Sequence, residues 1–475
     1  MPKIPSNIKH IHLIAVGGTG MGSLAGMLME KGFVVTGSDQ NIYPPMSTEL
    51  EALGILLMSG YSADNLKKKP DLVIVGNAVS KTNPEVLEMQ RQNLPYCSMP
   101  EALSHFFMRN NRSIVVAGTH GKTTTTAIIS HFLLEMDSDP SYLVGGVLQG
   151  NQKNYRQGSG PYFVIEGDEY DTAFFDKGPK FLHYKPYYTL VTSLEFDHAD
   201  IYRDLDHLTG SFVRLLEIGD PKGFVLACTH YPRLMEIIGK SYAAVETYGT
   251  ENNPQWKAGR FSFEEGKTIF DILYHNRLEI RMESPLPGRH NILNVLAAFA
   301  CLRKLGFKAE RIQEALKTFK GIKRRQEVLG VVGDIAVIDD FAHHPTAVAE
   351  TIDAVKKKYP GKKLIAVFEP RSNTSKRAVF QKDYAAAFAG ADQVILADVF
   401  MPEKVTDGKI LDVERLAQDI SDNGTPARHI SGVPSIVSHI ARNTPSPAVI
   451  LIMSNGGFGG IHQKVFEALK KQVGA

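Results

Sequence analysis

An apolar strand, a glycine-rich turn and a hydroxyl-rich helix start follow one another in Val115-Val116-Ala117-Gly118-Thr119-His120-Gly121-Lys122-Thr123-Thr124-Thr125-Thr126. Glycines in such a turn let backbone N–H groups approach phosphate oxygens, and the helix start adds further donors and the positive end of its dipole. We expect Lys122 to reach the outer phosphates of a nucleoside triphosphate and the Thr123 hydroxyl to bind Mg²⁺. The usual pattern G-x-x-x-x-G-K-S/T is not met, because Val116 stands where its first glycine belongs. The segment therefore predicts an ATP-binding α/β domain with a shortened phosphate loop; an ordinary strand–turn–helix with a surface lysine is the alternative.

The composition is typical of a globular enzyme. The chain has 475 residues, 43% of them hydrophobic and 22% charged, which predicts about two to four domains. The formal net charge of +2 gives no sign of a nucleic-acid partner. Three widely spaced cysteines indicate a reducing compartment and no zinc cluster. The sequence has neither a signal-peptide core nor an apolar run long enough for a bilayer, so we expect a cytoplasmic protein without membrane insertion.

A second glycine-rich turn lies near the amino terminus. Residues 8–16 are predicted to form a strand, and Gly17-Gly18-Thr19-Gly20-Met21-Gly22 then opens a helix. Asp39 follows the next strand, roughly twenty residues after the glycines, as expected for a Rossmann turn that binds a diphosphate and an acid that binds a ribose. Asn77, after the predicted strand at residues 71–76, lies where ligands of such sheets bind. Ser23 replaces the third glycine of the motif, and a purely structural turn remains the alternative.

Acids follow two predicted strands of the central region. One strand, residues 162–165, ends in Glu166-Gly167-Asp168-Glu169-Tyr170-Asp171. Carboxylates at the end of a strand in the same sheet as a phosphate loop are well placed for Mg²⁺, although a solvated acidic loop is the alternative. The next strand ends in Glu195-Phe196-Asp197-His198-Ala199-Asp200, where His198 is a metal ligand, a general base or neither.

Further along, His290, Asn291 and Asn294 lie at a predicted helix start. Asn291 and Asn294 share a face by their spacing, and an amide is able to pair with an adenine edge, although asparagine also caps helices. After a hinge around residues 321–327, strands alternate with helices once more. These strands end in Asp339-Asp340, Glu369-Pro370-Arg371-Ser372-Asn373-Thr374 and Ser454-Asn455-Gly456-Gly457-Phe458-Gly459-Gly460. The predicted fold class is α/β in three domains: a Rossmann-like domain (1–110), a P-loop-type ATPase domain (111–323) and a Rossmann-like α/β domain (324–475).

Along its whole length the chain resembles the Mur ligases, the ATP-dependent amide-bond ligases of peptidoglycan assembly, whose phosphate loop has this short form. The resemblance implies that ATP is bound by Gly118, Thr119, His120, Gly121, Lys122, Thr123, Thr124, His290, Asn291, Asn294, Arg325, Asp340 and His343. It implies Mg²⁺ on Thr123, Glu166 and His198, and it makes Lys122, Glu166, His198 and Arg325 the catalytic residues. Candidates for substrate binding are Gly18, Thr19, Gly20, Met21, Asp39, Asn77, Arg371, Asn373, Ser454 and Asn455. Arg371 offers a bidentate fork to a carboxylate, and the glycine-rich segment after Ser454 offers backbone N–H groups.

Within that family, the glycine turn at Gly17 and the pair His343-His344 resemble the branch that acts on UDP-N-acetylmuramate. Residues 166–177, 194–200, 369–374 and 454–460 resemble the members that attach a recovered murein tripeptide, L-Ala-γ-D-Glu-meso-diaminopimelate. The resemblance implies ligation through an acyl phosphate by a monomer or weak homodimer. Residues 211–214 carry no lysine where several relatives have a carbamylated one, so no carbamyl-lysine is expected. The alternatives are an L-alanine-adding ligase, a nicotinamide-dependent oxidoreductase and a P-loop protein that hydrolyses ATP without ligation.

Overall fold

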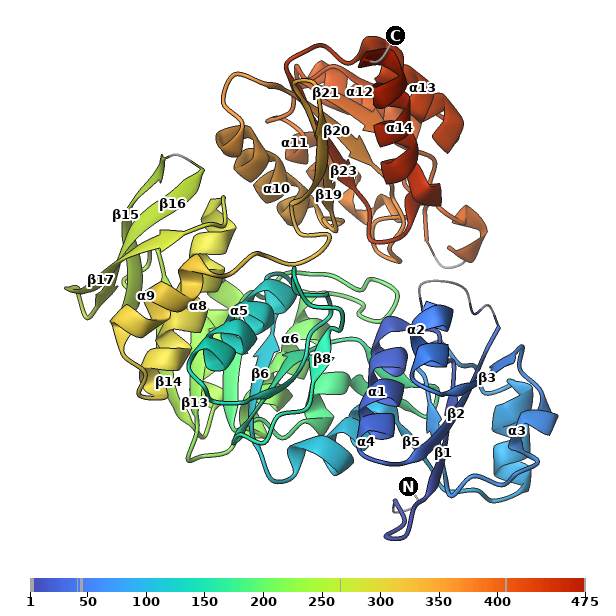
Figure 1. Cartoon of the computed structure of the whole chain (residues 1–475). Coiled ribbons are helices and arrows are strands. Elements are labelled where there is room, and N and C mark those ends of the chain that lie inside the picture. Colours follow the sequence, from blue (N-terminus) through green and yellow to red (C-terminus); the bar gives the residue numbers. More distant parts are fainter. Residues whose placement is uncertain (1–3, 41, 43–45, 265, 406–407, 474–475) are drawn as a thin grey trace. The chain divides into compact units, whose positions relative to one another are not determined.

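The computed structural model of the chain describes residues 4–40, 42, 46–264, 266–405 and 408–473 (Figure 1). It divides into two compact units, each described below by itself. The first comprises Met1–Glu195, Leu205–Gln255 and Ala297–Arg311, and the second Phe196–Asp204, Trp256–Leu296 and Ile312–Ala475. The sheets are mostly parallel and flanked by helices, which confirms the predicted three-domain α/β fold class.

The amino-terminal sheet has five strands in the order β3-β2-β1-β4-β5, all parallel. Its strands are β1 (His10–Ile14), β2 (Val34–Asp39), β3 (Leu56–Ser59), β4 (Leu72–Val75) and β5 (Tyr96–Ser98). Its helices are α1 (Thr19–Glu30), α2 (Met46–Ala52), α3 (Pro84–Arg91) and α4 (Met99–Leu103). The first strand is shorter than the predicted 8–16, because Ala15 has φ 69° and turns the chain out of the sheet.

The central sheet of the first unit runs in the order β14-β13-β12-β6-β9-β7-β8. Its strands are β6 (Arg112–Ala117), β7 (Ser141–Leu143), β8 (Tyr155–Arg156), β9 (Tyr162–Gly167), β12 (Tyr188–Val191), β13 (Phe224–Cys228) and β14 (Ala244–Gly249). Its helices are α5 (Lys122–Glu135), α6 (Leu205–Glu217) and α7 (Pro232–Ile237). Ala117 pairs with Gly167 of β9 and with Val191 of β12, so three strands end level with the phosphate loop. The short hairpin of β10 (Asp171–Ala173) and β11 (Asp176–Pro179) was not predicted.

The second unit contains an antiparallel group of strands and the carboxyl-terminal sheet. The antiparallel strands are β15 (Trp256–Glu264), β16 (Lys267–Tyr274) and β17 (Arg277–Ser284). The helices α8 (Arg289–Lys304) and α9 (Ala309–Lys317) follow in the chain, and each has residues in both units. The carboxyl-terminal sheet has the order β18-β19-β23-β20-β21-β22. Its strands are β18 (Glu327–Val332), β19 (Ile335–Asp340), β20 (Lys363–Phe368), β21 (Gln393–Leu396), β22 (Ala427–His429) and β23 (Ala448–Met453). Its helices are α10 (Pro345–Lys358), α11 (Gln381–Ala387), α12 (Val413–Asp422), α13 (Val433–Asn443) and α14 (Ile461–Val473).

Both faces of this last sheet are buried, because helices cover each side. Alternate residues of one strand enter different cores: Ile338 packs in one apolar cluster and Val337 in the other. This explains why its inner strands read as continuous apolar runs. The edge strand β18 was missed by the sequence analysis, since its Leu329 and Val331 are exposed and it pairs antiparallel with β19.

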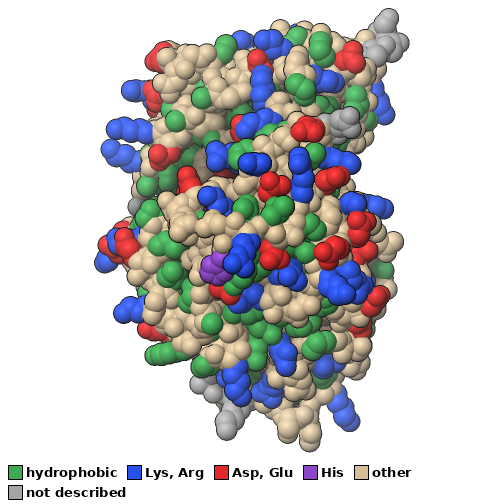
Figure 2. Space-filling model, turned by 90° about the vertical axis from the view of Figure 1, so that its left-hand side faces the viewer, with side chains coloured by type: hydrophobic (Ala, Val, Ile, Leu, Met, Phe, Trp, Pro, Cys, Tyr) green, Lys and Arg blue, Asp and Glu red, His purple; other side chains and the backbone are tan. Residues whose placement is uncertain are grey.

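Three further observations concern the surface, the helices and the cysteines. On the face drawn in Figure 2, basic and acidic side chains are interspersed, in keeping with a formal net charge of +2. Within the described ranges, no helix has both the length and the apolar character that a membrane span requires. The cysteines Cys97, Cys228 and Cys301 are all buried.

Candidate active site

The phosphate loop after β6 has a backbone that only glycine adopts readily. Gly118 has φ 135° and Gly121 has φ 79°, and Gly121 stands at the start of α5. A Cβ atom on Gly118 would lie 2.3 Å from Thr192 Oγ1 and 2.7 Å from the backbone N of Ser193. The first glycine of the short loop is therefore required by its approach to the end of β12 and by its own φ angle.

Side chains that follow β12 hold this loop in place. Ser193 Oγ accepts a hydrogen bond from the His120 N–H at 2.6 Å, and the Thr119 hydroxyl donates to the Glu195 carbonyl at 2.9 Å. His120 Nε2 lies 2.9 Å from Glu195 Oε2. Thr119 and His120, predicted as nucleotide-binding residues, thus anchor the loop to its neighbouring strand.

Lys122 is paired with a buried acid that the sequence analysis did not single out. Its Nζ donates to Glu169 Oε2 at 2.9 Å and Oε1 at 3.1 Å, and to the Gly118 carbonyl at 2.5 Å. Burial alone would lower the pKa of Lys122, but Glu169 and Asp168 outweigh it and raise that pKa above its ordinary value. The lysine is thus kept protonated inside the loop. No local signal marks this pair, because its members are 47 residues apart in the chain.

Glu166 and Thr123, both predicted as metal ligands, are in contact. The Thr123 hydroxyl donates to Glu166 Oε2 at 2.9 Å, and the backbone N of Gly145 donates to Glu166 Oε1. Burial and the nearby Asp168 raise the pKa of Glu166. A hydroxyl and carboxylates converging beside a phosphate loop are the hard oxygen donors that Mg²⁺ prefers, so the residues present fit this ion. The acidic run is not uniformly solvated, since Glu169 is only 1% exposed. Metal binding by the run stays a prediction.

The amino-terminal turn, predicted to bind a diphosphate, leaves space beside its backbone donors. A Cβ atom on Gly18 would meet no atom within 4 Å, and α1 begins at Thr19 without a side-chain cap or an acid in its first turn. Asp39 Oδ2 accepts a hydrogen bond from the backbone N of Gly17 at 2.9 Å. Gly20 and Met21 lie in the first turn of α1. Asn77, by contrast, donates its amide to the Asp171 carbonyl.

In the second unit, His198 lies in a group of histidines around one acid. It has φ 54°, and its backbone N donates to Asp197 Oδ1 at 2.7 Å and to Thr374 Oγ1 at 3.0 Å. Burial opposes the charged form of Asp197, but His198, His343 and His344 hold the pKa of this carboxyl well below its usual range. The ring Nδ1 of His343 lies 3.2 Å from the Phe341 carbonyl. The metal-binding role of His198 and the phosphate-facing role of His343 stay predictions.

Two of the three residues predicted to face adenine, Asn291 and Asn294, are buried near the start of α8. Asn294 Nδ2 donates to Asn291 Oδ1 at 3.1 Å, which confirms their shared face, and Asn291 Nδ2 donates to the Pro287 carbonyl at 2.7 Å. Asn291 is inside the helix and does not cap it. Burial lowers the pKa of His290 to about 4, so this ring is neutral at neutral pH.

Arg325 and Asp340 lie at the entry to the carboxyl-terminal sheet. Asp340 Oδ2 accepts from the backbone N of Gln326 at 2.8 Å, and its Oδ1 accepts from that of Ala342 at 2.7 Å. Burial raises the pKa of Asp340. The Arg325 guanidinium lies over the Phe341 ring, 4.9 Å from its centroid. The acid predicted to bind ribose therefore also holds the residue before β18 and the turn after β19.

The carboxyl ends of β20 and β23 bring the predicted amine-side residues together. Arg371 stacks 3.6 Å from the centroid of Phe400, and a Cβ atom on Gly456 would lie 1.9 Å from its Nε. Glu369 joins the two segments, because its Oε2 accepts from the Ser454 hydroxyl at 2.6 Å and its Oε1 lies 3.5 Å from Arg371 NH1.

Two further amine-side asparagines flank this pair. Asn373 is directed to Asp200, to whose Oδ2 it donates at 2.8 Å. Asn455 Oδ1 is buried and has no hydrogen-bond partner among the described residues. An acceptor in that situation is suited to a substrate N–H group.

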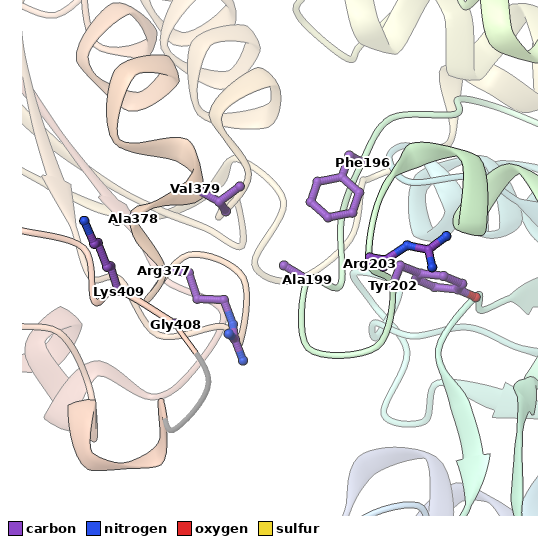
Figure 3. Close-up of a pocket in the computed structure, with 9 residues that line it drawn as sticks. All are labelled: Phe196, Ala199, Tyr202, Arg203, Arg377, Ala378, Val379, Gly408 and Lys409. Carbon is purple, nitrogen blue, oxygen red and sulfur yellow. The ribbon is translucent and has the colours of Figure 1, made fainter.

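A pocket of about 400 Å³ lies in the same unit. It is lined by Phe196, Ala199, Tyr202, Arg203, Arg377, Ala378, Val379, Gly408 and Lys409. Figure 3 shows Phe196, Ala199 and Val379 facing the hollow, with the Arg377 side chain extending along it. Arg377 Nε donates to the Asn373 carbonyl at 3.1 Å, which ties this wall to the loop after β20. The sequence analysis singled out none of these residues for binding.

Family models match three consecutive parts of the chain. They are described as "Mur ligase family, catalytic domain" for residues 10–111, "Mur ligase middle domain" for residues 116–302 and "Mur ligase, glutamate ligase domain" for residues 324–456. The predicted domain boundaries at 110 and 323 stay predictions.

Similar proteins match over almost the full length. A Haemophilus influenzae protein named UDP-N-acetylmuramate–L-alanyl-gamma-D-glutamyl-meso-2,6-diaminoheptandioate ligase is 37% identical over 468 residues, 98% of this chain and 100% of the relative. A UDP-N-acetylmuramate–L-alanine ligase from Acetivibrio thermocellus is 33% identical over 458 residues, 95% of this chain and 94% of the relative. The crystal structure of a murein peptide ligase from Psychrobacter arcticus has a TM-score of 0.74 and 34% identity, covering 97% of this chain and 99% of that one.

Proposed function

This chain belongs to the Mur ligase family, and we propose that it is an ATP-dependent ligase that joins the lactoyl carboxylate of UDP-N-acetylmuramate to the amine of L-Ala-γ-D-Glu-meso-diaminopimelate. One observation carries the choice of amine: a relative named for this tripeptide, in which diaminopimelate is written as 2,6-diaminoheptandioate, is 37% identical over 98% of the chain. ATP and Mg²⁺ are the expected cofactors. The reaction belongs to peptidoglycan recycling, in the cytoplasm.

The chemistry needs an activated carboxylate, because a carboxylate itself is a poor acyl donor. Transfer of the γ-phosphoryl group of ATP to the lactoyl carboxylate gives an acyl phosphate and ADP. The neutral amine of the tripeptide then attacks the acyl carbon, the amide bond forms, and phosphate leaves. Protein catalysis of the phosphoryl step consists mostly of positioning and of neutralising charge on the moving group.

Lys122 supplies this charge from within the phosphate loop. It is protonated and held by Glu169, and the loop carbonyl of Gly118 sets its direction. Backbone N–H groups at the start of α5 add donors for the β- and γ-phosphates. Thr123 and Glu166, with His198, would hold Mg²⁺, which supplies further neutralisation of phosphate and carboxylate charge when bound. Arg325 and Asp340 contribute from the second unit as predicted γ-phosphate and ribose contacts.

The amine substrate is proposed to bind to the second unit. Arg371, Asn373, Ser454 and Asn455 gather at the carboxyl ends of β20 and β23, where ligands of parallel sheets bind. Diaminopimelate combines an aliphatic chain with a terminal carboxylate. The hollow beside Phe196, Ala199 and Val379 offers apolar walls, and Arg377 offers a guanidinium that suits a carboxylate.

ADP release tests the proposal. The protein is incubated with ATP, Mg²⁺ and UDP-N-acetylmuramate, and L-alanine is compared with the tripeptide. We expect the tripeptide to be used with a kcat/KM at least about 100-fold higher, since L-alanine lacks the distal carboxylates. ADP release without any amine or UDP-sugar would instead indicate simple ATP hydrolysis.

A second candidate is the L-alanine ligase of the same branch. This candidate is supported by a relative named UDP-N-acetylmuramate–L-alanine ligase, which is 33% identical over 95% of the chain. A preference for L-alanine in the same assay would favour this candidate and reject the tripeptide.

A further inference from the structure

A buried carboxylate lies behind the amino-terminal turn and plays no part in the reaction described above. Glu85 is in the first turn of α3, and its side chain is fully buried among the strands of the amino-terminal sheet. Acids are common in the first turn of a helix, because the positive end of the helix dipole stabilises them, and there they are usually exposed to solvent. A fully buried acid in that position needs partners that compensate for the loss of water.

Both oxygens of Glu85 accept hydrogen bonds. Its Oε2 accepts from the Ser38 hydroxyl at 2.6 Å and lies 3.2 Å from His12 Nε2. Its Oε1 accepts from Asn65 Nδ2 at 2.5 Å and from the backbone N of Ser62 at 3.3 Å. These donors outweigh the effect of burial and hold the pKa of Glu85 below its ordinary value, so the group is a carboxylate at neutral pH.

The partners of Glu85 close a ring around the backbone of Asp39. Ser38 immediately precedes Asp39 at the end of β2. The Asp39 carbonyl accepts from the backbone N of Gly60 at 2.8 Å, and the Gly60 carbonyl accepts from Asn65 Nδ2 at 3.1 Å. The path from Glu85 through Ser38, Asp39, Gly60 and Asn65 therefore returns to Glu85.

The ring also reaches the glycine turn. The Ser38 carbonyl accepts hydrogen bonds from the backbone N of Ala15 at 2.8 Å and of Val16 at 3.0 Å. Asp39 Oδ2 then accepts from the backbone N of Gly17 at 2.9 Å. The turn at Gly17, proposed to bind the diphosphate, and Asp39, proposed to bind the ribose, are thus both held in position through Ser38, which is hydrogen-bonded to Glu85.

We propose that Glu85 is a positioning residue for the UDP-sugar site, acting through Ser38 and Asn65 to fix Asp39 and the turn at Gly17. This inference rests on the proposed function, because that function places the uridine nucleotide at the amino-terminal domain. A carboxylate suits this position since it accepts at both oxygens, whereas a carboxamide of the same shape accepts at only one.

The test is the affinity of the Glu85→Gln variant for UDP-N-acetylmuramate, measured by titration calorimetry on the full chain. We expect the dissociation constant to rise about tenfold, since a donor in the ring loses its charged acceptor. The KM values for ATP and for the amine should stay within about twofold of the wild type, because the phosphate loop has its own supports. If Glu85→Gln does not fold, Ser38→Ala is used instead, because it removes one link of the ring. We expect its dissociation constant for UDP-N-acetylmuramate to rise about threefold.

The matched control is Met89→Ala on the same helix. Met89 is fully buried in an apolar cluster with Val86 and Leu66, and no hydrogen bond joins its side chain to the described residues of the ring. Its replacement lowers thermal stability without touching Ser38 or Asn65. The positioning role would be overturned if Glu85→Gln bound UDP-N-acetylmuramate with wild-type affinity, or if Ser38→Ala did so in case Glu85→Gln does not fold. It would also be overturned if Met89→Ala lost as much affinity for UDP-N-acetylmuramate as the ring variant. A wild-type protein that does not bind UDP-N-acetylmuramate would refute the proposed function instead.

Discussion

Two glycine-rich turns follow parallel strands of this chain, and they differ in the charges around them. The turn at Gly17 opens α1 with backbone donors, and its nearest acid, Asp39, accepts from the turn itself. The turn at Gly118 leads into α5, whose first residue, Lys122, forms an ion pair with the buried Glu169. We propose that both turns offer N–H groups to a phosphate, and the second adds the positive charge of Lys122 and the acid that balances it.

The difference separates binding from phosphoryl transfer. A diphosphate that only has to be held is satisfied by backbone donors and a helix dipole, which change little during the reaction. A γ-phosphoryl group that moves needs positive charge nearby, and a lysine in a buried loop keeps its proton only if acids such as Glu169 accompany it. We therefore propose that the first turn binds substrate and that the second carries the chemistry, and the substitutions below test this division.

The largest effect is expected from Lys122→Ala. Without the ammonium group, the charge on the moving phosphoryl group loses a proposed positive partner, so kcat should fall about 10²- to 10³-fold. Steady-state ADP release with saturating substrates measures the change. Binding of UDP-N-acetylmuramate to the same variant should be unaltered, and a loss of less than about tenfold in kcat would end the assignment of chemistry to this turn.

Glu166→Gln is expected to have the next largest effect. The carboxamide keeps one acceptor for the Thr123 hydroxyl but loses the negative charge that suits Mg²⁺. The Mg²⁺ concentration for half-maximal activity should rise about 10- to 100-fold, measured by ADP release across a Mg²⁺ titration. Thr123→Ser keeps the hydroxyl and serves as the control with a normal Mg²⁺ requirement. If the requirement of Glu166→Gln is also normal, Glu166 does not bind the metal.

The sequence predicted the strands that carry these sites better than it predicted the contacts between them. Apolar runs with polar ends placed Lys122, Glu166, Asp340 and Arg371 at or soon after the ends of parallel strands, because burial on both faces of a sheet leaves a clear local pattern. The partner of Lys122 is different: Glu169 belongs to an acidic run whose members look alike until the fold buries one of them.

Glu85 shows the same limit in the amino-terminal domain. Its segment, Asn83-Pro84-Glu85, has the signature of a solvated helix start, and Asn83 does cap α3. The burial of its carboxylate depends on Ser38 and Asn65, which are 47 and 20 residues away in the chain. The edge strands β18 and β22 were missed for a related reason: β18 has several exposed residues and β22 has only three residues, so neither has a strong alternating pattern.

Asp39→Ala tests the first turn. It removes the acceptor of the Gly17 N–H and the predicted ribose contact, so the KM for UDP-N-acetylmuramate should rise about tenfold while that for ATP stays constant. Asp71→Ala is a matched control, because Asp71 accepts from the backbone N of Lys9 at 2.8 Å and of His10 at 2.9 Å, at the opposite end of the same sheet. Equal KM values for Asp39→Ala and Asp71→Ala would leave Asp39 without a role in binding.

Gly18→Ala gives the smallest expected effect and the sharpest separation of the two turns. Gly18 has φ −73°, which alanine adopts freely, and the new methyl group would meet no protein atom within 4 Å. Thermal stability should therefore be unchanged. The methyl group would nevertheless stand over backbone donors that a diphosphate must approach closely, so the KM for UDP-N-acetylmuramate should rise about threefold or more.

The matched substitution in the second turn is Gly118→Ala. There the methyl group would face Thr192 Oγ1 at 2.3 Å on a backbone with φ 135°, so stability and ATP use should both fall. A Gly18→Ala protein with wild-type KM for every substrate would mean that no diphosphate lies over this turn. The open space at Gly18 would then be a structural feature of the βα turn, and only the turn at Gly118 would bind phosphate.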